Sequence, residues 1–414
     1  MDGVAWQSRI GRPSQPTVER NETQHTGAAM ELTESRGHRL QPTDSDGSAM
    51  KFSLLIDGDS SGAASPAARY DEILREAQLA DELGFYAWGC PEQHFAFPRM
   101  TTSAPDALLA SVAARTERIK VRFSAITLHR YNHPLAVVER LSMLDNLSHG
   151  RAELSTARGN DVPTMHAFEI DPERTREIWE DSIRAVAHIL NNQSDFGYKG
   201  PFWNIPDIGK GLAPETYQRP HPPLTVVGAS PTSCAAAAER GLGIHFLDNY
   251  YGWDYIDSCV DAYHSADKNS AGIFDTPTDH IGFYVPSPLC ATTKEDALRD
   301  GAVQAIPWFE SILRQARLLW QQPGYEYTKA VEALESNYKD IDWMRKHTPS
   351  VLVGTPDEII DTALRLQEAG VDELLLRVDG FNHELHMRTI ELIGKHVIPA
   401  VGDAATKPAA AKTV

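Results

Sequence analysis

From residue 51 onward, short apolar runs alternate along the chain with segments that have the periodicity of amphipathic helices. We predict strands from these apolar runs at residues 52–56, 85–90, 119–126, 151–156, 224–227, 244–247, 280–285 and 373–378. About eight strand–helix units are typical of a closed (β/α)8 TIM barrel. A doubly wound open sheet is the alternative, but no Gly-x-Gly-x-x-Gly turn follows the first predicted strand. The sequence therefore predicts an α/β fold of the TIM-barrel type.

Two connections are longer than the others, and we predict insertions after strands four and seven. Residues 192–223 are rich in proline, glycine and aromatic residues and show no periodicity. Residues 305–350 carry tryptophans and tyrosines among helical stretches, and the helix before them is predicted to end near Gln304. Because long connections in a compact domain are often functional, this second insertion is either a lid or an additional helical layer.

The two ends of the chain differ in composition from the barrel region. Residues 1–49 are rich in polar residues, glycine and proline, which predicts a disordered N-terminal extension. The barrel is predicted at residues 50–400, followed by a flexible tail at residues 401–414. Met50 directly precedes the first strand. It is either the biological start or the point where a genuine flexible arm meets the barrel.

The composition excludes several kinds of partner. The formal net charge is -18, whereas nucleic acids and anionic membrane surfaces require a basic face. The four cysteines are scattered, which favours a reducing, cytoplasmic location over a disulfide framework. No apolar run is long enough to cross a bilayer, and no histidine–cysteine cluster has metal-ligand spacing. We interpret the acidic residues Asp57 and Asp59 as solvated loop residues.

Glu92, Gln93 and His94 stand at the C-terminal end of the second predicted strand. Catalytic residues of a TIM barrel gather at that end of the strands. A histidine there can act as a general acid or base near neutral pH, and a neighbouring carboxylate can fix its tautomer. The alternative is a buried histidine that bonds to Glu92 for packing alone.

Arg158 and Gly159 follow the fourth predicted strand, so a barrel would bring them to the same mouth. The Arg158 guanidinium offers a fork for a phosphate, and Gly159 lets a ligand approach the backbone. A surface arginine in a turn is the alternative.

Gly228, Ala229 and Ser230 form the turn between the fifth predicted strand and its helix. Backbone N–H groups and hydroxyls at a helix N-terminus bind anions. Arg176, in the first turn of the helix after strand four, can add positive charge to the same anion. The alternative interpretation of Ser230 is an ordinary helix N-cap.

Taken in order, these segments resemble the bacterial luciferase-like flavin-dependent monooxygenase family from Met50 to about Pro399. The resemblance is carried by Met50-Lys51-Phe52, Glu82-Leu83-Gly84-Phe85, Glu92-Gln93-His94-Phe95, Asn132-His133-Pro134, Met143-Leu144-Asp145-Asn146-Leu147-Ser148-His149-Gly150-Arg151, Ala157-Arg158-Gly159, Val227-Gly228-Ala229-Ser230, Val353-Gly354-Thr355-Pro356-Asp357-Glu358 and Ala369-Gly370-Val371-Asp372.

The resemblance implies a barrel that binds reduced FMN, which a separate NAD(P)H-dependent flavin reductase supplies. Members of the family react this flavin with dioxygen to a C4a-peroxyflavin and oxygenate a small organic substrate. By position, Arg158, Arg176 and Ser230 would hold the FMN phosphate together with the neighbouring backbone. Ser124 and Ala125 occupy the position of a strained, sometimes cis, peptide beneath the flavin ring. A homodimer is also expected from the resemblance.

One residue departs from the family pattern. Many members have Glu-His-His-Phe, whose first histidine is a catalytic base, and here that position is Gln93. An amide does not take up a proton at neutral pH, although it can orient a peroxide or a carbonyl. The acid–base role is therefore assigned to His94, with Glu92 as its orienting partner. Two other functions stay open, which are hydride transfer with a deazaflavin and flavin binding without catalysis.

Overall fold

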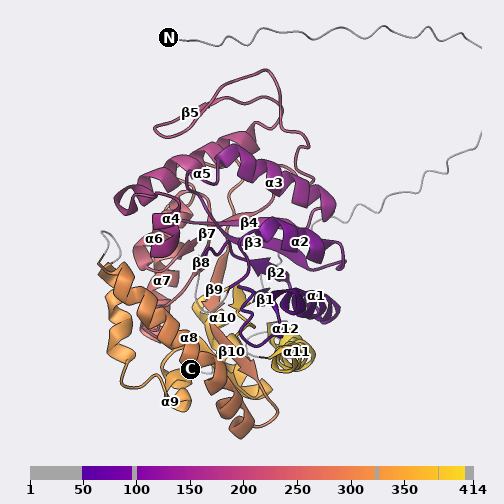
Figure 1. Cartoon of the computed structure of the whole chain (residues 1–414), viewed down its shortest axis with the longest axis vertical. Coiled ribbons are helices and arrows are strands. Elements are labelled where there is room, and N and C mark those ends of the chain that lie inside the picture. Colours follow the sequence, from indigo (N-terminus) through magenta and orange to yellow (C-terminus); the bar gives the residue numbers. More distant parts are fainter. Residues whose placement is uncertain (1–48, 96–99, 322–325, 381, 406–414) are drawn as a thin grey trace, which may run out of the picture. The chain divides into compact units, whose positions relative to one another are not determined.

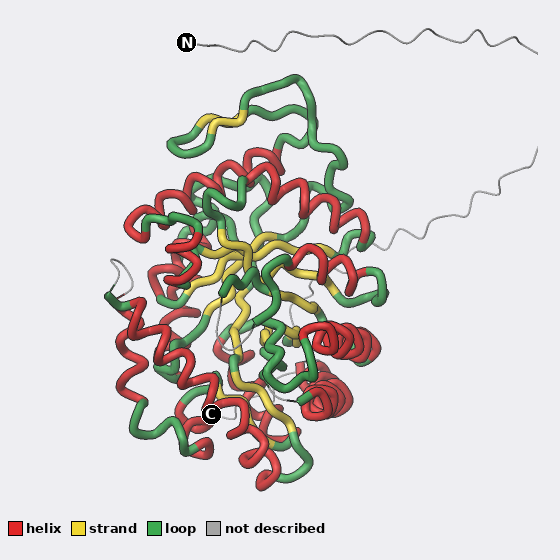
Figure 2. The backbone as a smooth tube through the Cα atoms, viewed as in Figure 1, coloured by secondary structure: helices red, strands yellow, loops and turns green. Residues whose placement is uncertain are grey.

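The computed structural model describes residues 49–95, 100–321, 326–380 and 382–405, and these residues form the predicted TIM barrel. Eight parallel strands close the barrel in the spatial order β1-β12-β9-β8-β7-β4-β3-β2. The strands, yellow in Figure 2, lie inside the helices, which are red. The strands are β1 (Lys51–Leu55), β2 (Ala87–Cys90), β3 (Lys120–Thr127), β4 (Ala152–Ala157), β7 (Leu224–Gly228), β8 (Gly243–Phe246), β9 (Ile281–Val285) and β12 (Glu373–Leu376). The first and last strands pair directly, with Lys51 opposite Glu373.

Helices surround the barrel strands (Figure 1). They are α1 (Pro66–Glu82), α2 (Pro105–Ala113), α3 (Pro134–Leu147), α5 (Thr175–Asn191), α6 (Pro231–Glu239), α7 (Trp253–Ser265), α10 (Pro356–Ala369) and α11 (His383–Leu392). Several begin with a proline, which has no N–H to satisfy in the first turn and whose φ is already helical. At the start of α1 the Ser65 hydroxyl accepts a hydrogen bond from the Ala68 N–H at 3.1 Å. Gly370 ends α10 with a φ of +101°, a left-handed conformation that suits glycine.

Additional elements follow β4 and β9, the fourth and seventh strands of the barrel. After β4 come α4 (Val162–Ala167), the 3-10 turn η1 (Pro172–Arg174) and, beyond α5, a hairpin of β5 (Tyr198–Lys199) and β6 (Asn204–Ile205). After β9 come β10 (Ser287–Cys290), α8 (Lys294–Leu319), η2 (Glu326–Leu334), α9 (Ile341–His347) and β11 (Val351–Gly354). Strand β10 pairs in parallel with β11.

Helix α8 is longer than the sequence predicted. The prediction ended it near Gln304, but it continues through Pro307 for a total length of 26 residues. Ala305, Phe309 and Leu313 are buried at helical spacing in a second hydrophobic cluster, to which β11 also contributes. Burial of this face offsets the backbone hydrogen bond that Pro307 cannot donate.

The C-terminal part of the chain stays helical beyond the predicted end of the barrel at residue 400. A π-helical turn, η3 (Ile393–Val397), leads into α12 (Ile398–Ala405), so the first residues of the predicted tail are helical. The rest of that tail and residues 1–48 of the predicted extension lie outside the described residues. Within the described ranges, no helix combines the length and the hydropathy of a membrane span.

Buried charges of opposite sign fill the barrel near the N-terminal ends of its strands. The Arg122 guanidinium donates to Glu373 at 2.8 and 3.1 Å and to Glu153 at 2.6 Å. The His280 Nε2 lies 2.7 Å from the Glu373 carboxylate. Burial acts to raise the pKa of the Glu373 carboxyl, but Arg122 and His280 outweigh it and lower this pKa well below its usual range. The ion pairs link β3, β4 and β12 across the barrel.

We predict that Glu373→Gln lowers the free energy of unfolding near pH 7 by about 3–5 kcal/mol, because the buried Arg122 loses compensating charge. The folded-state pKa of Glu373 lies below the ordinary value of 4.5. The carboxylate's contribution is therefore complete above that value and disappears as the pH falls toward the folded-state pKa. Urea unfolding of both proteins at about pH 7, 5 and 4 should show a cost that shrinks at the lowest pH.

Glu391→Gln is the matched control, because Glu391 pairs with Lys395 on an exposed surface. It should leave stability nearly unchanged at every pH, as exposed pairs contribute little. A Glu373→Gln protein that equals the wild type at neutral pH would contradict this account of the barrel interior.

Candidate active site

A cavity of about 350 Å³ lies at the C-terminal ends of the barrel strands. Residues at the ends of β1, β2, β3 and β4 form its walls, together with α4 and one face of α8. The predicted site residues that line it are Glu92, Gln93, His94, Ser124, Ala125 and Gly159. The barrel thus brings the predicted residues after the second and fourth strands to one mouth with Ser124 and Ala125, which were expected from the resemblance, whereas Gly228, Ala229 and Ser230 are not among the lining residues.

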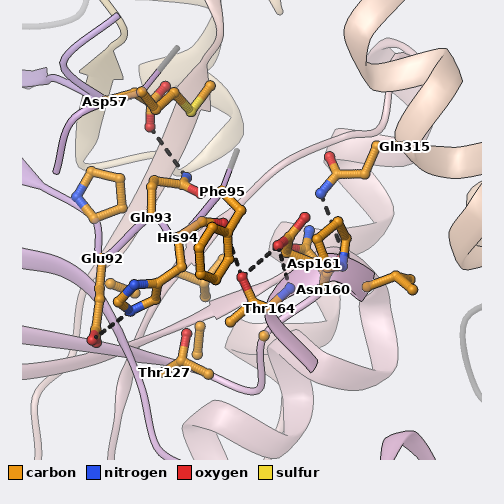
Figure 3. A pocket seen from close by; sticks show the side chains of 18 of the residues that line it. Asp57, Glu92, Gln93, His94, Phe95, Thr127, Asn160, Asp161, Thr164 and Gln315 are labelled. Atoms are coloured by element: carbon orange, nitrogen blue, oxygen red, sulfur yellow. Dashed lines mark hydrogen bonds and ion pairs between the residues drawn. The ribbon is translucent and has the colours of Figure 1, made fainter. Parts of the chain in front are cut away.

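A hydrogen bond of 3.0 Å joins His94 Nε2 to one oxygen of Glu92 (Figure 3). The other Glu92 oxygen accepts from the Asn132 amide at 2.5 Å, and Asn132 in turn accepts from Arg140 at 2.7 Å. The Glu92 side chain is only 6% exposed. A carboxylate held at both oxygens orients the imidazole and favours a proton on Nε2, which leaves Nδ1 to exchange a proton. Asn132 therefore positions Glu92. In the sequence it was named only within the motif Asn132-His133-Pro134, and this role was not predicted.

Aromatic rings pack around His94. Its ring meets Phe168 edge-on at 5.0 Å and Tyr131 at 5.7 Å between centroids, and those two rings stack at 4.4 Å. The His94 carbonyl accepts a hydrogen bond from the Thr164 hydroxyl at 3.0 Å. Both the ring and the backbone of His94 are therefore fixed by residues that the sequence did not point to.

Asp57 lies in the cavity wall, so its prediction as a solvated loop residue is wrong. It is 2% exposed, and its carboxylate accepts hydrogen bonds from Arg377 Nε and from the Gln93 amide, the latter at 3.4 Å (Figure 3). The Arg377 guanidinium lies over the Trp308 ring of α8 at 3.6 Å. Burial raises the pKa of the Asp57 carboxyl, although Arg377 acts against this. Asp59 is also buried, so the same prediction is wrong there.

Two residues of the cavity wall, Ser124 in β3 and His129 just after it, carry buried polar atoms that lack a partner among the described residues. The Ser124–Ala125 peptide bond is cis. The Ser124 hydroxyl and His129 Nδ1 are buried without a hydrogen-bond partner in the described part of the chain. Because His129 Nε2 donates to the Arg158 carbonyl at 2.6 Å, Nδ1 is left as an acceptor. Burial lowers the pKa of His129, so the ring stays neutral. Such atoms are expected to bond to a polar ligand or to water.

The two predicted phosphate-binding arginines are not among the residues that line the cavity. Arg158 is half-buried after β4, and Arg176 is exposed in the first turn of α5. The neighbouring Gly159 does line the cavity, with a φ of +83°. A Cβ at Gly159 would come within 2.8 Å of the Thr127 side chain, so a larger residue would not fit. The phosphate role of both arginines stays a prediction.

Ser230 is the N-cap of α6, as its alternative interpretation predicted. Its hydroxyl accepts from the Ser233 N–H at 3.2 Å, and Ser233 Oγ accepts from the N–H groups of Ala229 and Ser230 at 3.2 and 3.0 Å. Those two N–H groups are therefore engaged within the turn. Gly228, Ala229 and Ser230 do not line the cavity, whereas Val227 just before them does.

One face of α8 covers the cavity, and it lies within residues 305–350, for which the sequence left a lid and an additional helical layer open. Its lining residues recur at helical spacing and are Trp308, Ser311, Ile312, Arg314, Gln315 and Leu318. The Gln315 amide donates to the Asn160 carbonyl at 3.4 Å (Figure 3), and Leu319 packs against Met165 of α4. The individual lining residues were not predicted, because the helix was expected to end near Gln304.

Two clusters have the composition of metal sites. The first is Glu76, His383 and His386, and the second is His245, His280 and Glu373, of which His245 also lines the cavity. In the first, one Glu76 oxygen accepts from Arg69 at 2.8 Å and lies 2.9 and 2.8 Å from the two histidines. In the second, Arg122 binds Glu373. An arginine already compensates each carboxylate, so we assign no metal to either cluster.

Residues 50–373 match the family described as luciferase-like monooxygenase. The chain belongs to this family. The match extends from the residue before β1 to the first residue of β12 and so includes the residues that line the cavity except Leu375. Members related to this chain are oxidoreductases, so the protein is an enzyme of the luciferase-like monooxygenase type.

Three curated relatives illustrate the similarity. The 4-hydroxyprotoasukamycin monooxygenase of Streptomyces nodosus subsp. asukaensis is 29% identical over 333 residues, 79% of this chain and 85% of that protein. The oxygenase component of the flavin-dependent trigonelline monooxygenase of Acinetobacter baylyi is 24% identical over 370 residues, 86% and 96% of the two chains. An uncharacterised Sinorhizobium fredii protein is 32% identical over 197 residues, so this match spans only 48% of this chain and 56% of the relative.

Solved structures share the fold. Monooxygenase RslO1 from Streptomyces bottropensis has a TM-score of 0.69 and 28% identity and covers 85% of this chain and 99% of its own. The oxygenating constituent of 3,6-diketocamphane monooxygenase from Pseudomonas putida, solved with FMN, has a TM-score of 0.65 and 20% identity, with 85% and 98% covered. The coenzyme F420-dependent tetrahydromethanopterin reductase of Methanopyrus kandleri has a TM-score of 0.59 and 15% identity, with 85% and 99% covered.

Proposed function

We propose that this enzyme is a flavin-dependent monooxygenase that uses reduced FMN and dioxygen to oxygenate a small organic substrate. The observation that carries the proposal is the cavity at the barrel mouth. There the fixed Glu92–His94 pair lines a largely apolar space, and Ser124 and His129 of the same wall carry polar atoms without a partner among the described residues. Reduced flavin, when bound, would supply the electrons that activate dioxygen for transfer of one oxygen atom to the substrate.

The residues of the cavity fit a flavin ring. An isoalloxazine has an apolar face and one polar edge with an N–H donor and carbonyl acceptors. The His129 Nδ1 acceptor and the Ser124 hydroxyl are suited to that edge, and Gly159 leaves room for a close approach to the backbone. We assign Ser124, Ala125 and Gly159 to the ring. A second group of predicted residues is assigned to the phosphate and comprises Arg158, Arg176, Gly228, Ala229 and Ser230.

His94 is the proposed acid–base group, and Glu92 and Asn132 position it. Gln93 orients a bound group through its amide, since it cannot take up a proton. Trp308 and Ile312 on α8 cover the cavity with apolar surface. Exclusion of water by this surface would prevent the reduced oxygen from being lost as hydrogen peroxide.

We further propose that a separate NAD(P)H-dependent flavin reductase supplies the reduced FMN. The Acinetobacter baylyi relative is named an oxygenase component, which supports a division of labour of this kind. We also propose that the enzyme is a homodimer located in the cytoplasm. The buried free thiols of all four cysteines fit a reducing compartment.

The proposed function is tested by mixing the protein with reduced FMN without oxygen and then admitting air. A species whose absorbance differs from that of both reduced and oxidised FMN should form and outlast the oxidation of free reduced FMN. Oxidation at the rate of free flavin, with no such species, would contradict the proposal. Tight binding of an F420-type deazaflavin in that case would support the alternative, hydride transfer.

Arg158→Ala should weaken FMN binding by about 1.5–3 kcal/mol, the strength of a charge-assisted hydrogen bond. Riboflavin lacks the phosphate and should bind wild type and variant about equally, as measured by fluorescence titration. An equal loss of riboflavin affinity would show that Arg158 does not bind the phosphate.

His94→Ala should lower turnover by about a hundredfold or more, the usual share of general acid–base catalysis. Flavin affinity should change little, since the phosphate residues follow other strands. The matched control is His166→Ala, because His166 is exposed in nearby α4. Turnover and hydrogen peroxide release are measured together, with Gln93→His as the variant that restores the commoner family pattern. Full, coupled turnover by His94→Ala would place the acid–base group elsewhere.

A further inference from the structure

Asp57 presents a buried carboxylate to the cavity, and one of its oxygens is only weakly engaged. Oδ2 accepts from Arg377 Nε, whereas the bond from Gln93 to Oδ1 measures 3.4 Å. Protein N–H···O hydrogen bonds are usually about 2.7–3.2 Å long, and each carboxylate has roughly four acceptor positions. Oδ1 therefore has capacity for a stronger donor that enters through the cavity.

The charge of Asp57 is already compensated by the ion pair with Arg377. The Arg377 side chain is 1% exposed, lies over the Trp308 ring and is not among the residues that line the cavity. Desolvation of a second cation next to this pair would cost several kcal/mol, and an anionic group would be repelled by the carboxylate. A neutral donor such as a hydroxyl group meets neither penalty.

Apolar side chains line much of the cavity that Asp57 borders, together with Tyr284. Leu55 and Leu375 line the cavity from the barrel strands, and Trp308 and Ile312 line it from α8. A ligand with an apolar body gains free energy from contact with such walls. One polar anchor in an apolar space fixes the orientation of the bound molecule.

We propose that Asp57 binds a hydroxyl group of the substrate, and hence that the substrate is a neutral, largely apolar molecule that carries a hydroxyl. This assignment rests on the proposed function, because Gln93, which contacts Asp57, stands where the family pattern has its base. When the substrate binds, its hydroxyl replaces the Gln93 amide as the hydrogen-bond donor to Asp57 Oδ1. The hydroxyl anchor would thus set which carbon of the substrate faces the flavin.

The test compares 2-naphthol with naphthalene as probes by calorimetric titration of the flavin-loaded protein under nitrogen. The two probes share an apolar body and differ by one hydroxyl group. The wild type should bind 2-naphthol at least about tenfold more tightly, the effect of a hydrogen bond to a charged group. Equal affinities, or no measurable binding of 2-naphthol up to its solubility limit, would overturn the proposal.

Asp57→Asn should abolish this preference. Arg377 Nε donates a hydrogen bond, so it requires the amide oxygen of the asparagine, and the NH2 group, a donor, then faces the cavity. Should the single variant fail to fold, the neutral pair Asp57→Asn with Arg377→Gln carries the test. A preference that survives in the folded variant would overturn the proposal.

Two further variants separate Asp57 from its neighbours. Gln93→Met keeps the size of the side chain and frees Oδ1, so the preference for 2-naphthol should persist or increase. Gln315→Met removes another polar side chain that lines the cavity, at a position with no assigned role in flavin binding, and should also leave the preference intact. Loss of the preference in either of these variants, with retention in Asp57→Asn, would assign the hydroxyl to another residue.

The outcome is separable from that of the proposed function. Probe binding is measured without oxygen, whereas the proposed function is tested by the reaction of reduced FMN with air. A protein that stabilises the oxygen-dependent species but does not distinguish the probes would retain the proposed function and lose the Asp57 assignment. A protein that distinguishes the probes but does not form the oxygen-dependent species would retain the Asp57 assignment and lose the proposed function.

Discussion

The ion pair between Arg377 and Asp57 joins the first and last strands of the barrel at the mouth of the cavity. Arg377 follows β12 and Asp57 follows β1, and the two residues are 320 positions apart in the sequence. The guanidinium lies over Trp308 of α8, and the carboxylate accepts from Gln93 after β2. Gln304 anchors the same helix by donating to the carbonyls of Arg377 and Asp379. The buried pair therefore supports the β1–β12 closure of the barrel, contacts α8 and sets the polarity of this part of the cavity wall.

Much of this arrangement was predictable from local patterns. Alternating apolar runs and helical periodicity predicted the barrel, because each unit carries its own signal and parallel units close in only a few ways. The barrel geometry then brought Glu92, Gly159 and Ser124 to one mouth. The Glu92–His94 pair was a candidate because a carboxylate and a histidine stand two residues apart just beyond a buried strand, and the structure joins them by a hydrogen bond.

The sequence does not show which residues that are far apart in the chain contact each other in the fold. An acidic residue after a strand, such as Asp57, is indistinguishable from a solvated one until the distant Arg377 is placed beside it. The length of α8 depended in the same way on a second core that buries Phe309, which local propensity around Pro307 does not reveal. The turn at Ser230 shows that a sequence pattern typical of an anion site can also have a purely structural explanation. Its hydroxyls and N–H groups bond to one another, so no ligand is needed to account for them.

The central claim is that the cavity between the strand ends and α8 holds the reduced flavin beside the Glu92–His94 pair. A crystal structure of the protein with reduced FMN, grown and cooled without oxygen, tests it most directly. The account predicts the flavin ring inside the cavity against Ser124 and Ala125, with a polar ring atom bonded to His129 Nδ1. A flavin ring bound outside the cavity, or inside it but with His129 Nδ1 still unpartnered and Glu92–His94 turned away, would contradict the account.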